Sequence, residues 1–298
     1  MKYFSDTSDP EQNNKKTYQA LIITLVGNLL LAVGKMTVAQ IAPSAALQAD
    51  AYNSFSDVLY SITLVIGMLI ALRPADISHP QGHRRFEPLV GLVISCSMAL
   101  AGYQAVTGSI DKIRNGVEPF EFGLPVIVLL LSAIIKALMF WLINRIAKDL
   151  ASPTLQTAAL DNLTDTITSF TAIIGILLSG IWTPLADPIA GILVAIWIFR
   201  AAFNAIRENL NFLTGAGAPE ERRKQFLEVI NTVPGVGNVH QLFAEYVGTK
   251  YMLDVHINVD GKTTLYEVHR IESEIEDRLT AIPDVERVYV HVEPMGYD

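Results

Sequence analysis

Residues 50–71 read DAYNSFSDVLYSITLVIGMLIA, and this stretch decides the fold. Its second half is part of an apolar run, and a bilayer core of about 30 Å takes about 20 mostly apolar residues. Its first half carries Asp50 and Asp57, and acids at such depth are costly and usually face a protein interior or a watery cavity. The stretch therefore predicts a membrane-spanning helix that carries a functional site.

The same apolar character recurs along the first two thirds of the chain. Six spans are predicted, at roughly 18–41, 46–72, 88–110, 123–145, 155–181 and 184–206. Apolar residues make up 51% of the 298 residues and charged residues only 17%, against roughly 25% charged in a soluble domain. This composition argues against a wholly soluble protein. Because acids outnumber bases and no basic cluster stands out, it also argues against a nucleic-acid partner.

The last third of the chain is acidic. Residues 208–298 hold 16 acidic and 8 basic side chains, and therefore the whole net charge of −8. Helical spacing over 219–233 and 264–282, with strand-like runs at 239–246, 251–259 and 285–292, predicts the order αββαβ. We therefore expect a polytopic α-helical membrane domain, 1–207, followed by a small α+β, ferredoxin-like domain, 208–298, with its helices on one face of a three-stranded sheet.

Basic residues near the span ends predict the orientation. Eight fall on one side: Lys15, Lys16, Arg73, Arg84, Arg85, Arg145, Lys148 and Arg207. Lys112 and Arg114 fall on the other side. The positive-inside rule then places both termini and the acidic domain in the cytoplasm.

Two pairs of oxygen-donor side chains lie within the second and fifth spans. Asn53 and Asp57 are four residues apart, as are Asp161 and Asp165, so each pair lies on one face of its helix. Facing each other, the pairs would offer four ligands to a divalent cation, which would offset the repulsion among three carboxylates. The alternative is that the acids are protonated or bonded to the backbone and only link helices. Asp50 would be a further ligand or a packing residue.

The chain as a whole resembles the cation diffusion facilitators. The resemblance rests on the two pairs above, on SHPQGHRRFE at 78–87 and on DPIAG at 187–191, and it covers 15–294. It implies export of a divalent metal from the cytoplasm, usually in exchange for protons, by a homodimer with alternating access. By position, Asn53, Asp57, Asp161 and Asp165 would form the intramembrane transport site.

The ligand types in these pairs favour one metal over others. Members of the zinc type usually carry a histidine in at least one pair, whereas all six histidines here lie outside the predicted spans. Oxygen ligands suit harder ions such as Mn²⁺, and the site resembles that of the manganese-type subgroup. Zn²⁺, Fe²⁺ and Cd²⁺ stay open, because zinc exceeds manganese in intrinsic affinity at most sites. Without a histidine, exchanged protons would have to sit on Asp57, Asp161 or Asp165.

Two further groups match metal-binding positions of the family. Asp76, His79 and His83 match a loop site of zinc-transporting relatives. A solvated loop, whose histidines contact lipid headgroups or the tail together with Arg84 and Arg85, explains them equally well. In the cytoplasmic domain the matching residues are His240, His256, His269, His291 and Glu293. Metal bound there would tighten a dimer of these domains. The resemblance also implies a charge contact between Arg85 and the cytoplasmic domain.

A different class of function stays open. An intramembrane hydrolase would use two aspartates as an acid and a base, but two pairs supply more ligands than such a dyad needs. We therefore expect a carrier that is not an enzyme, has no prosthetic group, and lies in a prokaryotic plasma membrane. Lys35 and Lys136, inside apolar runs, are expected to pair with carboxylates or to line a cavity.

Overall fold

The structure is a computed structural model that describes residues 10–41, 45–116, 124–181, 183 and 185–296. The chain divides into two compact units. One, the membrane unit, comprises residues 10–72 and 87–210. The other, the tail unit, comprises the described residues 211–296 together with the loop 73–86. The domain boundary predicted between residues 207 and 208 stays a prediction.

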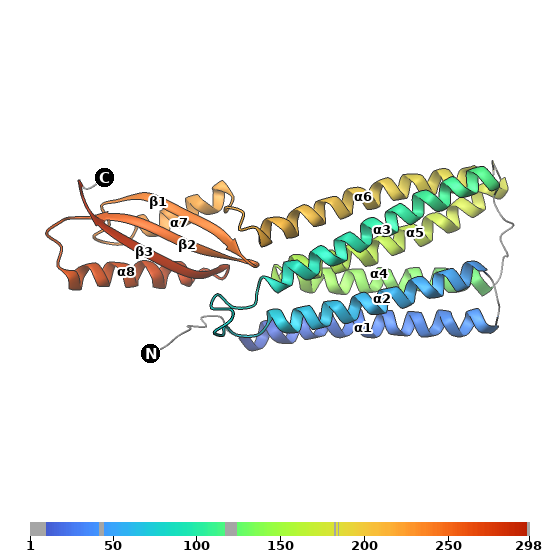
Figure 1. Ribbon diagram of the computed structural model, residues 1–298, viewed down its shortest axis with the longest axis horizontal. Coiled ribbons are helices and arrows are strands. Elements are labelled where there is room, and N and C mark those ends of the chain that lie inside the picture. The colour runs from blue at the N-terminus through green and yellow to red at the C-terminus, as the bar shows by residue number, and fades with distance from the viewer. Residues whose placement is uncertain (1–9, 42–44, 117–123, 182, 184, 297–298) are drawn as a thin grey trace. The chain divides into compact units, whose positions relative to one another are not determined.

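The membrane unit consists of six long helices that run side by side (Figure 1). They are α1 (Pro10–Ile41), α2 (Ala45–Ala71), α3 (Phe86–Asn115), α4 (Leu124–Leu150), α5 (Pro153–Ile181) and α6 (Ala186–Leu213). Five of the described helices, all except α5, are long and apolar enough to cross a bilayer. The helix α5 has 29 residues and carries the acids of the predicted fifth span. The prediction of a polytopic helical membrane protein is confirmed.

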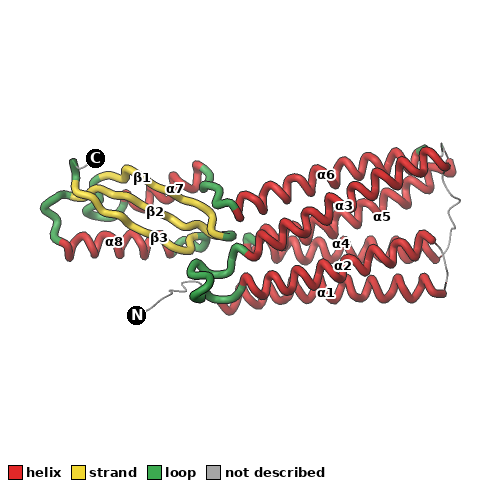
Figure 2. The backbone as a smooth tube through the Cα atoms, in the orientation of Figure 1, coloured by secondary structure: helices red, strands yellow, loops and turns green. Residues whose placement is uncertain are grey.

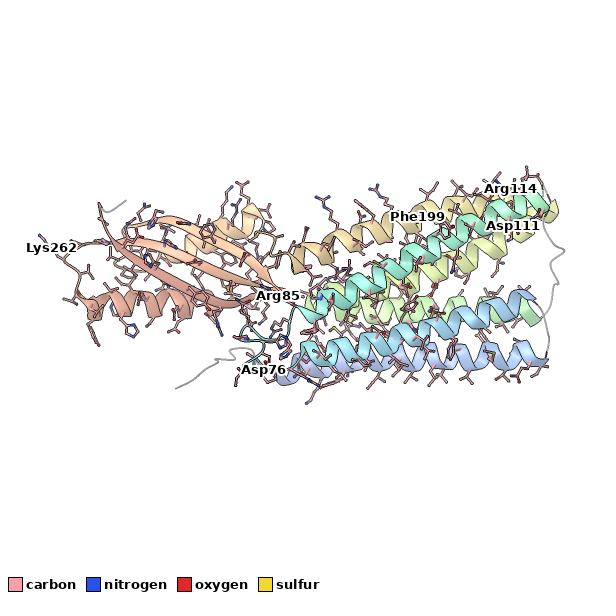
Figure 3. The ribbon with its side chains drawn as sticks, viewed as in Figure 1. Asp76, Arg85, Asp111, Arg114, Phe199 and Lys262 are labelled. Atoms are coloured by element: carbon pink, nitrogen blue, oxygen red, sulfur yellow. The ribbon has the colours of Figure 1, made fainter. Side chains whose placement is uncertain are left out.

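Four helices of the membrane unit pack in the series α2, α1, α4 and α5. The helix α4 packs against α5 and α1, and α1 packs against α2. Elsewhere, small residues let helices approach closely, as is common in membranes. A Cβ atom added at Gly91 on α3 would lie 2.2 Å from Oδ1 of Asn209 on α6. Apolar side chains such as Phe199 on α6, labelled in Figure 3, are exposed on the outer surface of this unit, where lipid would cover them.

The tail unit contains α7 (Glu220–Asn231), β1 (Asn238–Val247), β2 (Lys250–Val259), α8 (Leu265–Thr280) and β3 (Val285–Pro294) (Figure 2). The sheet order is β1-β2-β3; β1 pairs antiparallel with β2, and β3 pairs parallel with β2. The parallel pair requires a crossover, which α8 provides. The predicted order αββαβ is therefore confirmed.

One face of this sheet holds the core. Phe226 of α7, Ile275 of α8 and Val255 of β2 are fully buried in a single apolar cluster. Both helices therefore cover the same face, as predicted, because β2 alternates apolar residues inward with polar residues outward. The opposite face, called the open face below, carries polar and aromatic side chains that neither α7 nor α8 covers.

Candidate metal sites

The acids of α2 and α5 lie in the membrane unit beside a lysine of α4. The Lys136 ammonium Nζ is 2.8 Å from Oδ2 of Asp57 and 2.7 Å from Oδ2 of Asp165, so it bridges the two carboxylates. Asp57 and Lys136 are 8% and 4% exposed. The pairing with carboxylates expected for Lys136 is confirmed, and it brings the two predicted transport helices together at one point.

The other residues predicted for the transport site are placed as follows. Asp161 lies one turn before Asp165 on α5 and interacts electrostatically with Asp57, Asp165 and Lys136. Within the described part of the chain, the three aspartates do not form a group whose oxygens all lie within metal-bridging distance. Asn53 lies one turn before Asp57 on α2. Its side chain, like that of Asp50, lies outside the described residues.

A polar contact between α1 and α2 supports the position of Asp57. The amide Nδ2 of Asn28 on α1 donates to Ser61 Oγ at 2.8 Å. Ser61, one turn after Asp57, donates in turn to the Asp57 backbone oxygen at 2.7 Å. Because buried polar groups must find partners, these bonds link α1 and α2 next to the acid. The sequence analysis did not single out Asn28 or Ser61.

The loop between α2 and α3 brings Asp76, His79 and His83 together. One ligand atom from each lies within 4.8 Å of the others. The His79 backbone N–H donates to Asp76 Oδ1 at 2.7 Å, and this bond holds the pKa of the Asp76 carboxyl below its ordinary value. His83 Nδ1 lies 3.1 Å from the Pro74 oxygen. That oxygen only accepts, so in the neutral imidazole Nδ1 is the donor and Nε2 is the nitrogen that can bind a metal.

The same loop makes an ion pair within the tail unit. Arg84 Nε lies 3.1 Å from Oε2 of Glu286 on β3, and Lys250 Nζ lies 3.3 Å from the same oxygen. The turn between β1 and β2 also packs on the loop backbone, because a Cβ atom at Gly248 would lie 2.7 Å from the Arg84 carbonyl carbon. The charge contact was expected at Arg85. The structure instead places its neighbour Arg84 in it.

A β-bulge positions a second group of ligands on the open face of the sheet. Val239 pairs with Ile257 and Gln241 with His256, so His240 is an extra residue in β1. His240, His256 and Glu293 then offer ligand atoms within 4.8 Å of one another. His240 Nδ1 lies 3.0 Å from the Asn258 amide oxygen, which leaves His240 Nε2, 3.5 Å from Glu293, as the available ligand atom.

The two remaining histidines of the predicted tail site differ in position. His291 pairs with His256 across β2 and β3, and the ring centroids are 4.9 Å apart. His291 Nε2 lies 3.2 Å from Glu293, at the edge of the group. His269 is on α8, which covers the other face of the sheet, and it lies beside Glu272. The tail unit therefore brings four of the five predicted ligands together and separates His269 from them.

Comparison with known families covers nearly the whole chain. Residues 21–214 match the family described as the cation efflux transmembrane domain. Residues 218–295 match the family described as the cation efflux protein cytoplasmic domain. The two matches follow the six helices and the αββαβ domain in the same order.

Individual relatives are similar over almost their full lengths. An uncharacterised transporter of Methanocaldococcus jannaschii is 34% identical over 94% of this chain and 99% of its own. The manganese efflux system proteins MneS and MneP of Bacillus subtilis are 26% and 27% identical. The match to MneS covers 94% of this chain and 97% of the relative, and the match to MneP covers 96% and 98%.

Proposed function

The chain belongs to the cation efflux family, and from this premise we propose that it exports Mn²⁺ from the cytoplasm in exchange for protons. One observation carries the proposal: acids from two membrane helices, Asp57 and Asp165, meet at the Lys136 ammonium inside the membrane unit. With Asn53 and Asp161 one turn away on the same helices, they supply the oxygen ligands of the transport site.

The choice of manganese rests on ligand chemistry. Carboxylate and amide oxygens suit Mn²⁺, whereas imidazole and thiolate ligands suit Zn²⁺. The described side chains around Asp57 and Asp165 include neither histidine nor cysteine. Similarity to two manganese efflux proteins of Bacillus subtilis points the same way. A carrier for Zn²⁺, Fe²⁺ or Cd²⁺ is the alternative within the family.

The remaining features of the carrier follow from the family and from charge. We place the protein in the plasma membrane with both termini in the cytoplasm, because basic residues gather on the side of the tail unit. Protons taken up by the acids of the site would be the exchanged ions. The functional form is a homodimer that alternates access, with the cytoplasmic domains contributing to its interface.

The loop and tail groups are proposed as metal sites outside the membrane. Asp76, His79 and His83 form the first, and His240, His256 and Glu293 with the adjacent His291 form the second. Mixed imidazole and carboxylate ligands at such distances suit a transition metal. We assign them a regulatory role, in which cytoplasmic metal bound by the tail tightens the dimer.

Uptake into proteoliposomes tests the function. The initial uptake rates of Mn²⁺, Fe²⁺, Zn²⁺ and Cd²⁺ are compared, with a pH-sensitive dye reporting proton movement. Mn²⁺ should be carried most efficiently with protons moving oppositely, and Asn53→His should shift the preference toward Zn²⁺. A wild type that carries Zn²⁺ best, unchanged by Asn53→His, would contradict the manganese assignment. Metal uptake without proton movement in the opposite direction would contradict the proposed exchange for protons.

A further inference from the structure

The transport site already contains a positive charge that belongs to the protein. Lys136 Nζ donates to Asp57 at 2.8 Å and to Asp165 at 2.7 Å, one oxygen from each of two helices. The lysine is buried, and it also interacts electrostatically with Asp161. Its ammonium therefore takes the position between the two carboxylates that a metal bridging them would need.

Burial explains why this position holds a cation. Carboxylates inside a membrane unit are not left charged and unpaired, because their desolvation is too costly. Lys136 supplies hydrogen bonds as well as charge, and charge-assisted bonds of this length are strong. A second buried lysine, Lys35 on α1, also acts electrostatically on Asp165. The carboxylates of Asp57 and Asp165 are thus compensated without any metal.

We propose that Lys136 is a tethered competitor of the transported metal. Its ammonium occupies the site when metal is absent, leaves when a divalent cation binds Asp57 and Asp165, and returns as the metal is released. The inference rests on the proposed function, because it takes these acids as the transport site. Lysine suits the task, since its compact charge sits on a flexible four-carbon stem and can move while its helix stays in place.

Such a competitor affects both ends of the transport cycle. Metal must displace an ion pair in order to bind, so the apparent affinity is lower than three carboxylates alone would give. The returning ammonium replaces the metal as the partner of the acids, so release is faster. The metal-free site also stays compensated inside the membrane, which allows the empty carrier to return.

The test compares KM and kcat for Mn²⁺ uptake in proteoliposomes made with full-length wild type, Lys136→Met, Lys136→Arg and Lys148→Met. Lys136→Met removes the competitor, so KM should fall at least tenfold and kcat should also fall, because tightly held metal leaves slowly. Lys136→Arg keeps the charge and adds a fork that binds carboxylates bidentately, so its KM should lie at least threefold above that of wild type. Lys148, exposed near the end of the same helix, is the matched control.

The outcomes separate this inference from the proposed function. If the wild type carries metal but Lys136→Met has an unchanged or higher KM, the competitor role is overturned and the carrier function stands. If the wild type carries no divalent cation, the proposed function is overturned, and the competitor role is overturned with it.

A folding failure of Lys136→Met is detected by size-exclusion chromatography, and the test then rests on Lys136→Arg. The competitor role predicts a KM at least threefold above wild type for this variant, and a smaller increase, or none, overturns it. In variants that fold, thermal melting gives a second measurement. Mn²⁺ should raise the melting temperature of Lys136→Met more than that of wild type, and an equal or smaller rise would contradict the proposal.

Discussion

The carboxylates of the membrane unit and the ligands of the tail unit solve the same electrostatic problem differently. Asp57 and Asp165 are bridged by a buried lysine, whereas His240, His256 and Glu293 lie partly exposed on the open face of a sheet. Water can solvate the tail ligands, so they need no built-in cation. Asp57 is buried and has no such solvent, and the protein itself supplies its partner.

Under the proposed function, this difference separates transport from sensing. A site compensated by its own lysine exchanges one cation for another and is suited to turnover. A half-exposed site of imidazole and carboxylate gains charge compensation only from the metal it binds, so it is suited to report metal concentration. The predictions below test whether the two sites act separately.

The largest expected effect is at the membrane site. Replacing Asp57 by asparagine removes one of the two carboxylates that meet at Lys136. We expect the initial Mn²⁺ uptake rate in proteoliposomes to fall at least about 100-fold, because a charged ligand and its pairing are both lost. Asp111→Asn, at an exposed position near the end of α3 (Figure 3), is the control and should keep the wild-type rate. If the Asp57→Asn variant keeps more than a tenth of the wild-type uptake rate, Asp57 is not part of the transport site.

Substitution in the tail should change metal binding and leave the transport site intact. His256→Ala removes the central ligand of the open-face group. In equilibrium dialysis of the full chain with Zn²⁺, we expect one class of sites to weaken about tenfold or more, in line with the effect of losing a metal-site residue. His269→Ala is the control, because that residue lies on the helix covering the other face. Equal losses for both variants would contradict the separation of His269 from the site.

A smaller effect is expected at the start of α8. The Thr264 hydroxyl accepts from the Glu267 backbone N–H, and Glu267 accepts from Thr264 in return. Thr264→Ala should lower the stability of α8 by about 1 kcal/mol, as the loss of an N-cap does. Hydrogen exchange of the α8 amides in the full chain measures this change. Mn²⁺ uptake should be unaffected, and a large loss of uptake would show that the two regions are not separable.

The smallest effect is expected in the loop. The ion pair between Arg84 and Glu286 is partly exposed, and such pairs contribute roughly 0.2–1 kcal/mol. Arg84→Gln should therefore speed hydrogen exchange in residues 73–86 only a few-fold, while Arg85→Gln should leave it unchanged. If Arg85→Gln has the larger effect, the contact belongs to the residue expected from the sequence.

The architecture could be predicted because it depends on local patterns. Apolar runs predicted the helical membrane domain, and the alternation of apolar and polar residues in β2 predicted a sheet with one covered face. The spacing of four between Asp161 and Asp165 placed both on one side of α5. Each of these inferences uses only residues that are close in sequence.

The unpredicted features depend on packing between distant segments. Lys136 and Asp57 are 79 residues apart, and no helical periodicity indicates which acids a buried lysine will meet. The bulge at His240 was missed because strand alternation assumes an unbroken register. Whether Arg84 or Arg85 reaches Glu286 depends on the loop backbone, and neighbouring residues of the same type cannot be distinguished by composition.

The bulge in β1 also bears on how the proposed metal site of the tail unit can change over evolutionary time. Val239 and Leu242 on either side of the bulge pack against the apolar core, while His240 is surplus to the strand register. A single substitution at that position can therefore create or remove a candidate metal ligand without any further substitution in the hydrophobic core. The proposed metal binding by this domain is thus free to change over evolution independently of how the domain folds.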